Sequence, residues 1–289
     1  MIEEALATVR DPELDAPITE LGFVSHIAEN DGEVEVELRL PTYFCAPNFA
    51  YLMVADAYDA VAAVPGVKKV VVRLEDHFAS DEINSGVAAS RGFEGSFPGL
   101  ADGELEELRR TFRRKAHRAC QEQVASRLLK AGWTMLTLAD TTLGEARAAL
   151  TGARLGEARV AVTATTIGEA EAALTSVRPA GEARPSPGAL APPPSSSGAA
   201  SAAPEEEQAE IEFERLRRRR AELGLSSGPE AALLVQDDGT PITAVDLPLQ
   251  LRMAKTTRIS IEGNSGLCRG LLSVRYGLPR PPGVDQAAG

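Results

Sequence analysis

The clearest pattern in this chain is an alternation of charged and apolar side chains over residues 33–40, which read Glu-Val-Glu-Val-Glu-Leu-Arg-Leu. A two-residue period of this kind predicts a β-strand with one buried face. Residues 48–64 instead repeat apolar side chains at three- and four-residue spacing, which predicts an amphipathic helix. A single cysteine, Cys45, lies in the short turn between the two elements.

The flanking residues complete a small domain, residues 1–78. A helix is expected over 2–10 and a strand over 18–29, and Asn30-Asp31-Gly32 is typical of a hairpin turn. A last strand is expected over 67–75. A hairpin followed by a strand–helix–strand crossover predicts two layers, with helix packed on a sheet.

Beyond residue 78 the pattern changes several times. The expected segments are an irregular connector at 79–101, a long helix plus a βαβα repeat layer at 102–178, a disordered Pro/Ala/Ser linker at 179–204, a charged helix and small C-terminal α/β module at 205–278, and a disordered tail at 279–289. The chain as a whole is therefore predicted to be α/β, of the α+β kind.

The repeat layer is expected because residues 141–151 return, nearly unchanged, at 165–175. Each copy follows a short β-rich run, the first of which is 135–138. Thr142 and Glu145 have the spacing of a capping box, which starts a helix. The repeated unit is therefore predicted to be a strand followed by a helix.

In the C-terminal module, strands are expected at 233–235 and 258–262, with a helix at 244–254 between them. The second strand is expected to open into a glycine-rich loop at 263–270 that contains Cys268. Glycines permit close backbone approach, so this loop can form a nest for an anion or a metal cluster. The alternative is a tight turn around a buried cysteine.

Composition excludes several classes of function. The net charge of −12 and the pI near 4.9 argue against nucleic-acid binding and against adhesion to anionic membranes. No apolar run approaches the ~20 residues of a membrane span, and the acidic first residues lack a signal-peptide pattern. Three widely spaced cysteines suit a reducing cytoplasm, where we expect the protein to lie.

Cys45 is the best candidate for chemistry. Pro47 is well tolerated in a first helical turn, so Cys45 is expected beside a helix N-terminus, where the helix dipole favours a thiolate, the form that binds metal. The alternative is a small buried hydrophobic residue. The histidines are scattered, and although His117 and Cys120 share a helix face, they have no companion ligand nearby. No catalytic constellation is present, and we expect the protein not to be an enzyme.

The first 76 residues resemble the small iron–sulfur assembly domain of the SufT and PaaD proteins. The resemblance rests on ordered motifs: Asp11-Pro12-Glu13, Ile18 to Val24, the alternating strand, the Thr42 to Cys45 turn, and Val64-Pro65-Gly66-Val67 leading into Val70-Val71-Val72. The family usually has proline directly after the cysteine, whereas here Ala46 precedes Pro47.

The resemblance implies an iron–sulfur cluster assembly or maturation factor that binds a cluster transiently and delivers it to a client apoprotein. Cys45 and Cys268 are the predicted metal ligands, and Asp11, Glu13 and Thr42 are predicted to line the cofactor site. An alternative arrangement is a cluster shared by the Cys45 thiolates of the two chains of a homodimer. The alternative function is a metal-free adaptor or chaperone-like partner of a multicomponent oxygenase, and an enzyme with Cys45 as nucleophile ranks last.

Overall fold

Three strands form the sheet of the N-terminal part of the chain, in the order β1-β2-β3. They are β1 (Val24–Asn30), β2 (Glu33–Arg39) and β3 (Lys69–Glu75). β1 and β2 are antiparallel, and β2 and β3 are parallel, so the predicted hairpin and crossover are confirmed. Asp31 and Gly32 have φ of 50° and 85°, as a tight two-residue hairpin turn requires. The first strand begins at Val24 rather than at 18, because residues 18–23 form turns.

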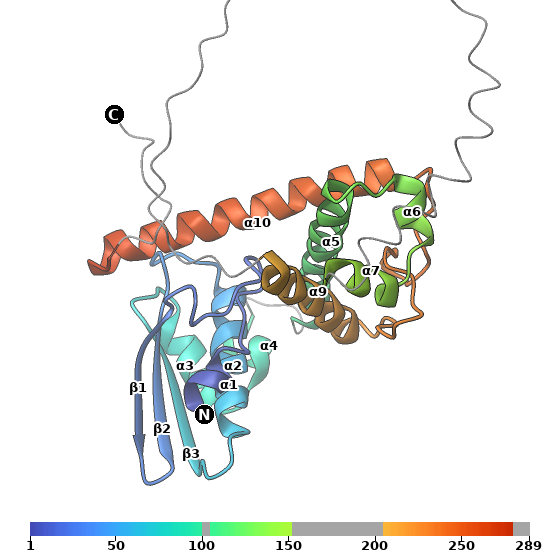
Figure 1. Ribbon diagram of the computed structural model, residues 1–289. Helices are drawn as coiled ribbons and strands as arrows, with labels where there is room; N and C mark the ends of the chain where they lie inside the picture. The colour runs from blue at the N-terminus through green and yellow to red at the C-terminus, as the bar shows by residue number, and fades with distance from the viewer. Residues whose placement is uncertain (100–104, 152–204, 280–289) are drawn as a thin grey trace, which may run out of the picture.

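The computed structural model describes residues 1–99, 105–151 and 205–279 (Figure 1). In residues 1–99, here called the N-terminal lobe, the sheet is covered by helices. They are α1 (Ile2–Leu6), α2 (Pro47–Ala62), α3 (Ser80–Ala88) and α4 (Gly92–Ser96). The alternating strand behaves as predicted, since Val34, Val36 and Leu38 are buried in the core while the residues between them are not.

The segment 79–101 is not an irregular connector, because it contains α3 and α4. α3 is held by Ile83 and Val87, which are four residues apart and buried in the core of the N-terminal lobe. The two helices have only nine and five residues, and four glycines break the hydrophobic pattern in this segment. Such short elements form because they pack on an existing core, a contact that the local sequence does not reveal.

A second group of helices forms the helical lobe. Its members are α5 (Glu106–Lys130), α6 (Met135–Asp140), α7 (Leu143–Leu150) and α9 (Glu205–Glu222), with the loop 223–246. The long helix expected in segment 102–178 and the charged helix expected in segment 205–278 are observed as α5 and α9. The loop contains isolated bridges, such as Val235 with Pro241, instead of the strand expected at 233–235.

The predicted strand–helix repeat is wrong in its first unit. Residues 135–138 belong to α6, because the Thr134 side chain accepts a hydrogen bond from the Thr137 amide at 3.1 Å and so starts a helix. The predicted capping box is confirmed, since Thr142 and Glu145 cap each other's backbone at the start of α7. The second unit at 165–175, the linker at 179–204 and the tail beyond residue 279 lie outside the described residues.

The C-terminal module consists mainly of one helix, α10 (Leu247–Tyr276), rather than the predicted helix, strand and glycine loop. The glycines at 263, 266 and 270 are part of this helix, which ends at Gly277 in the left-handed conformation typical of a C-terminal cap. α10 runs along both lobes (Figure 1). Leu247 at its start is buried in the core of the helical lobe, and Leu272 near its end is buried in the core of the N-terminal lobe.

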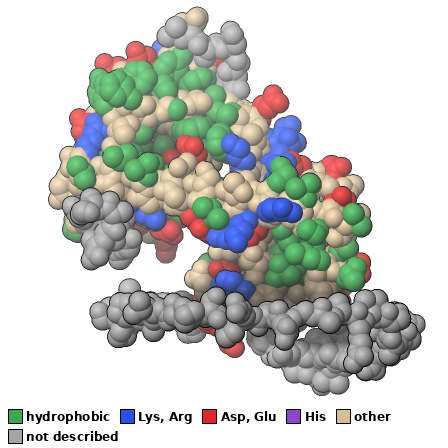
Figure 2. Space-filling model, turned by 90° about the horizontal axis from the view of Figure 1, so that it is seen from above, with side chains coloured by type: hydrophobic (Ala, Val, Ile, Leu, Met, Phe, Trp, Pro, Cys, Tyr) green, Lys and Arg blue, Asp and Glu red, His purple; other side chains and the backbone are tan. Residues whose placement is uncertain are grey.

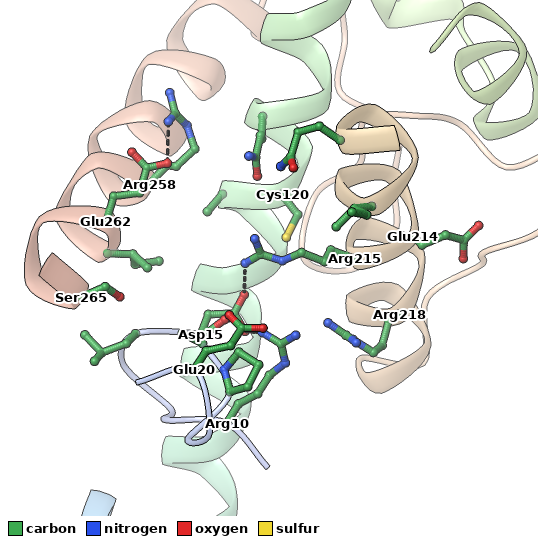
Figure 3. A pocket seen from close by; sticks show the side chains of 18 of the residues that line it. Arg10, Asp15, Glu20, Cys120, Glu214, Arg215, Arg218, Arg258, Glu262 and Ser265 are labelled. Carbon is green, nitrogen blue, oxygen red and sulfur yellow. Dashed lines mark hydrogen bonds and ion pairs between the residues drawn. The ribbon is translucent and has the colours of Figure 1, made fainter. Parts of the chain in front are cut away.

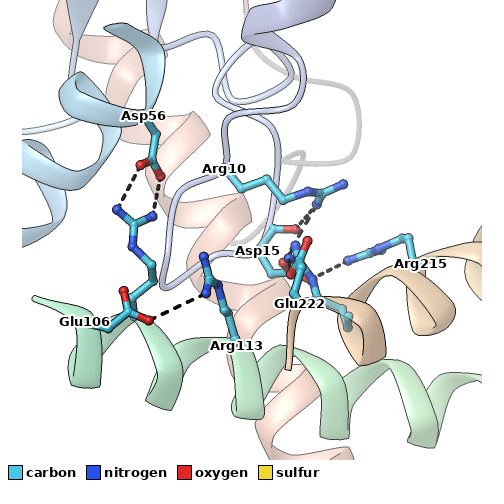
Figure 4. Close-up of polar contacts among 9 residues, drawn as sticks. Arg10, Asp15, Asp56, Glu106, Arg113, Arg215 and Glu222 are labelled. Carbon is cyan, nitrogen blue, oxygen red and sulfur yellow. Dashed lines mark hydrogen bonds and ion pairs between the residues drawn. The ribbon is translucent and has the colours of Figure 1, made fainter. Parts of the chain in front are cut away.

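Ion pairs add to the contact between the lobes (Figure 4). Arg109 of α5 binds Asp56 of α2 through two hydrogen bonds, of 2.6 and 2.9 Å. Asp15 of the N-terminal lobe binds Arg215 and Arg219 of α9. Within the described ranges, no helix is long and apolar enough to cross a membrane.

Candidate functional site

The candidate site lies where β2 and β3 end. Because these strands are parallel, their carboxyl ends meet at one edge of the sheet, where α/β folds usually bind ligands. The chain leaves β2 at Arg39, turns through residues 40–46 and enters α2 at Pro47. The C-terminal half of α10 passes over this edge (Figure 1).

Cys45 occupies the predicted position at the N-terminus of α2. Ala46 is the residue that caps the helix, and Pro47 is the first helical residue. The Cys45 side chain is half-buried, and its Sγ lies 3.3 Å from the hydroxyl oxygen of Thr42. The thiol is therefore neither sealed in the core nor fully exposed, and a hydroxyl from its own turn orients it.

His77 holds the Cys45 turn from the other side. Its Nε2 donates to the carbonyl oxygen of Cys45 at 2.7 Å, while its Nδ1 accepts from the Ala79 amide at 3.2 Å. This pattern requires the neutral ring with the proton on Nε2. Burial lowers the pKa of His77, the Cys45 carbonyl raises it, and the positive charge of Arg275 lowers it further, so the neutral form persists.

α10 brings Cys268 to the same site. Both cysteines pack against the core of the N-terminal lobe. Burial raises the pKa of the Cys268 thiol to about 11, and the negative charges of Asp11, Cys45 and Glu13 raise it as well. α10 is fixed here by Arg275, which donates to the carbonyl of Leu40 at 3.1 Å. Cys268 is therefore part of a helix within electrostatic reach of Cys45, and not part of a glycine loop.

Asp11 and Glu13 come from the turn after α1. Asp11 accepts hydrogen bonds from the amides of Glu13 and Leu14, each at 2.8 Å, which fixes this turn. Burial raises the pKa of Asp11 to about 6, although the two amides oppose this. The structure thus gathers all five predicted site residues at one end of the N-terminal lobe, and a role for Asp11, Glu13 and Thr42 in binding a cofactor stays a prediction.

The ligand set of this site is incomplete within one chain. Among the residues that the structure describes, no three His, Cys, Asp or Glu side chains are placed to hold a metal ion. The third cysteine, Cys120, is buried in the core of the helical lobe, and His117 of the same helix is fully buried. The described part of one chain therefore offers at most two thiols to a ligand at the Cys45 turn.

Two features of the site were not predicted from the sequence. One is the role of His77, whose ring binds the Cys45 carbonyl. The other is an exposed aromatic cluster of Tyr43, Phe44 and Phe78, whose ring centroids lie 5.0 to 6.4 Å apart. The adjacent aromatic residues Tyr43 and Phe44 in the turn before α2 were the available signal, because exposed aromatic groups often mark binding surfaces.

Replacing His77 with alanine is expected to loosen the Cys45 turn, because the Cys45 carbonyl loses its partner. A lost hydrogen bond to a buried group costs about 1–3 kcal/mol, so we expect the thiol to react several times faster. The measurement is the rate of reaction of Cys45 with a disulfide reagent in a chain that carries Cys120→Ser and Cys268→Ser. His26→Ala, at an exposed position of β1, is the control and should react at the parent rate. Equal rates for His77→Ala and the control would show that His77 does not restrain the turn.

Comparison with known proteins covers the part of the chain that contains the Cys45 turn. The family model described as "Iron-sulfur cluster assembly protein" matches residues 1–73. An uncharacterized protein of Methanocaldococcus jannaschii is 33% identical over 81 residues, which cover 28% of this chain and 83% of that protein. No solved structure matches the chain. Through residues 1–73, which contain the Cys45 turn, this chain belongs to the iron–sulfur cluster assembly protein family.

Proposed function

We propose that this protein is a carrier that binds an iron–sulfur cluster transiently through Cys45 and passes it to a client apoprotein. The cluster is cargo, and the role is not an enzymatic one. The observation that supports this proposal most directly is that α10 brings Cys268 within electrostatic reach of the Cys45 thiol, although the two residues are far apart in sequence.

The surroundings of the two thiols favour a cation. Asp11, Glu13 and Cys45 raise the pKa of Cys268 because their negative charge opposes a further negative charge. The same charge attracts iron, and a bound metal lowers the pKa of its ligands. Metal binding would therefore favour loss of the proton from Cys268.

An incomplete ligand set suits a cluster that must be released to a client protein. Iron–sulfur clusters are usually held by four thiolates, whereas Cys45 and Cys268 supply two. The remaining ligands would come from a second copy of the chain, from a small thiol or from the client. A reducing compartment such as the cytoplasm keeps these thiols free.

The test is anaerobic reconstitution of the full chain with ferrous iron and sulfide, followed by visible absorption and by iron and sulfide analysis. Cys45→Ser is expected to reduce bound iron and sulfide to background, and Cys268→Ser to make the cargo dissociate faster. Cys120→Ser is the matched control, because Cys120 lies in the other lobe. If Cys45→Ser binds as much iron and sulfide as the wild type, the carrier role is wrong.

A metal-free adaptor is the second candidate function, and the exposed aromatic cluster of Tyr43, Phe44 and Phe78 favours it. Further apolar side chains are exposed on α10, at Leu249, Met253, Leu267, Leu271 and Val274. Figure 2 looks onto this side of the molecule and shows hydrophobic surface toward both of its ends. A chain that stays colourless after reconstitution and still binds its client, for example an oxygenase component, would support the adaptor.

A further inference from the structure

A cleft separates the N-terminal lobe from the helical lobe, away from the Cys45 turn. Its volume is about 740 Å³, within the range of small-molecule sites (Figure 3). Side chains reach it from four segments: the loop 10–20, α5, α9 and α10. Those that the argument uses are Arg10, Asp15, Glu20, Arg215, Arg218 and Arg269.

One carboxylate in the wall of this cleft is shared by three arginines. Asp15 is buried, with 6% of its side chain exposed, and its Oδ2 lies 3.1 Å from Arg215. Arg219 binds the other oxygen, Oδ1, and Arg10 lies 3.9 Å from the same atom. Arg219 has a second acidic partner, Glu222. Three guanidinium groups are thus compensated by two carboxylates.

Two further arginines add to this excess of positive charge. Arg218 is exposed on α9, Arg269 is half-buried on α10, and neither has an ion-pair partner among the described residues. Glu20, Glu214 and Glu262 also line the cleft and oppose part of this charge, although Glu214 already pairs with Arg147 and Arg217, and Glu262 with Arg258. The pKa of Arg10 falls to about 10, first because of burial and then, against the attraction of Asp15, because of repulsion by Arg219, Arg218 and Arg215. Positive charge at this point is therefore not fully balanced.

One hydrogen-bond donor of the cleft is also unpaired. The Nε atom of Arg215, whose side chain lines the cleft, is buried and has no hydrogen-bond partner. Buried donors without partners are rare in folded proteins, and this one remains able to bind an acceptor atom. Guanidinium groups donate in a planar, forked arrangement that matches phosphate oxygens.

We propose that this cleft binds a small molecule that carries a phosphate group, held by Arg215 and Arg218 of α9 and Arg10 of the N-terminal lobe. Phosphate fits better than a carboxylate because one group supplies up to two negative charges and several acceptor oxygens, which matches several convergent arginines. The apolar side chains of Leu14, Ile211 and Ile261, which also line the cleft, would contact the rest of the ligand.

The bound ligand would connect the lobes. Arg10 belongs to the N-terminal lobe, Arg215 and Arg218 to α9, and Arg269 to α10, so one anion would contact three separate segments. Arg269 directly follows Cys268 in α10. A ligand bound in the cleft would therefore contact the residue next to the Cys268 thiol.

The test is titration calorimetry of the full chain at low salt with inorganic phosphate, pyrophosphate, adenosine monophosphate and malonate as separate probes. We expect saturable binding of at least one phosphate compound and weaker or no binding of malonate. Tighter binding of adenosine monophosphate than of phosphate and pyrophosphate would indicate an organic phosphate ester, and the reverse order an inorganic phosphate.

Arg218→Gln is expected to weaken binding about ten-fold or more, since a charge-assisted hydrogen bond is lost. It is the variant of choice because Arg218 is exposed and unpaired, so the fold does not depend on it. Arg217→Gln removes the neighbouring charge, which pairs with Glu214, and should leave binding unchanged. Absence of saturable binding by all phosphate probes, malonate binding as tight as phosphate, or equal losses in the two variants would overturn the proposal.

Discussion

Replacing Arg220 with methionine is expected to lower the free energy of unfolding of the helical lobe by about 3–5 kcal/mol. Arg220 of α9 is fully buried, with an exposed fraction of 0%, and no carboxylate of the described residues pairs with it. Its two Nη atoms donate instead to backbone carbonyls of the loop 223–246: Ser226 at 3.2 Å, Ala232 at 2.8 Å and Leu233 at 2.6 Å. Methionine fills much of the volume but leaves these buried carbonyls without a donor.

The loss of stability extends beyond these three carbonyls because Arg220 is part of a hydrogen-bond network. Arg220 also contacts the side-chain oxygen of Gln121, and Gln121 binds the backbone of Val235 on both sides, at 2.7 and 3.0 Å. Burial lowers the pKa of Arg220 to about 10, which still leaves it charged at neutral pH. The loop is therefore anchored to α5 and α9 through one cation.

Urea denaturation followed by fluorescence measures this effect, because the single tryptophan, Trp133, packs against the core of the helical lobe. Arg217→Met is the matched control on the same helix. Arg217 is 39% exposed and pairs with Glu214, so its loss should change the stability by at most about 1 kcal/mol. If both variants unfold at the same urea concentration as the wild type, the buried network does not stabilise the lobe.

The second large effect is a pH dependence of stability that is caused by His117. This histidine of α5 is fully buried, and neither ring nitrogen has a hydrogen-bond partner. The pKa of His117 is lowered from 6.5 to about 4, mainly by burial and also by the positive charges of Arg220 and Arg118, while Asp237 opposes the shift. Between pH 6.5 and 4 the unfolded chain therefore takes up a proton that the folded chain does not.

The direction of the effect follows from this difference. The contribution of His117 is constant above pH 6.5, and stability falls as the pH drops from 6.5 to 4. The loss is about 1.4 kcal/mol per pH unit, or roughly 3 kcal/mol in all. Asp11 acts in the opposite direction, because its pKa is raised from 3.8 to about 6 and the folded chain holds the extra proton. The net pH profile of the wild type is therefore not a clean measure of His117.

A comparison with His117→Leu isolates the contribution of His117 to the pH dependence of stability. Leucine removes two buried unsatisfied nitrogens, so the variant is expected to be more stable than the wild type by about 1–3 kcal/mol at pH 7.5. That difference should grow by roughly 3 kcal/mol by pH 4. The measurement is urea denaturation followed by Trp133 fluorescence across this range, with the exposed His26→Leu as control. A difference between wild type and variant that stays constant with pH would show that folding does not lower the pKa of His117.

The errors in predicting the fold come from residues whose local pattern permits two structures. Met135-Leu-Thr-Leu138 is a short apolar run, and such a run cannot distinguish strand from helix. The Thr134 cap decides for a helix. Residues 258–262 are β-branched in part and precede three glycines, which argued for a strand and loop. Arg258 binds Glu122 of α5, however, and Leu272 is buried in the N-terminal lobe, so contacts at both ends hold this segment in one helix.

The candidate site also has a part that the sequence predicted and a part that it did not. Cys45 was placed correctly because the strand, the turn and the helix around it are adjacent in sequence, and the Thr42 contact lies within one turn. The approach of Cys268 depends on a helix that docks from the far end of the chain, and no local pattern encodes that contact. The role of His77 also could not be predicted from the sequence, because its partner is a backbone carbonyl, which every residue carries.

What the sequence by itself determined is therefore the set of elements whose stability is local. These are the β1–β2 hairpin with its Asp31-Gly32 turn, the crossover through α2, the position of Cys45 at the start of that helix and the capping box of α7. The tertiary structure alone decided the course of α10, the placement of Cys268 within electrostatic reach of Cys45, and the arginine-lined cleft. The physical reason is that side-chain periodicity and capping act between residues a few positions apart, whereas docking energy comes from surfaces that are brought together only when the chain folds.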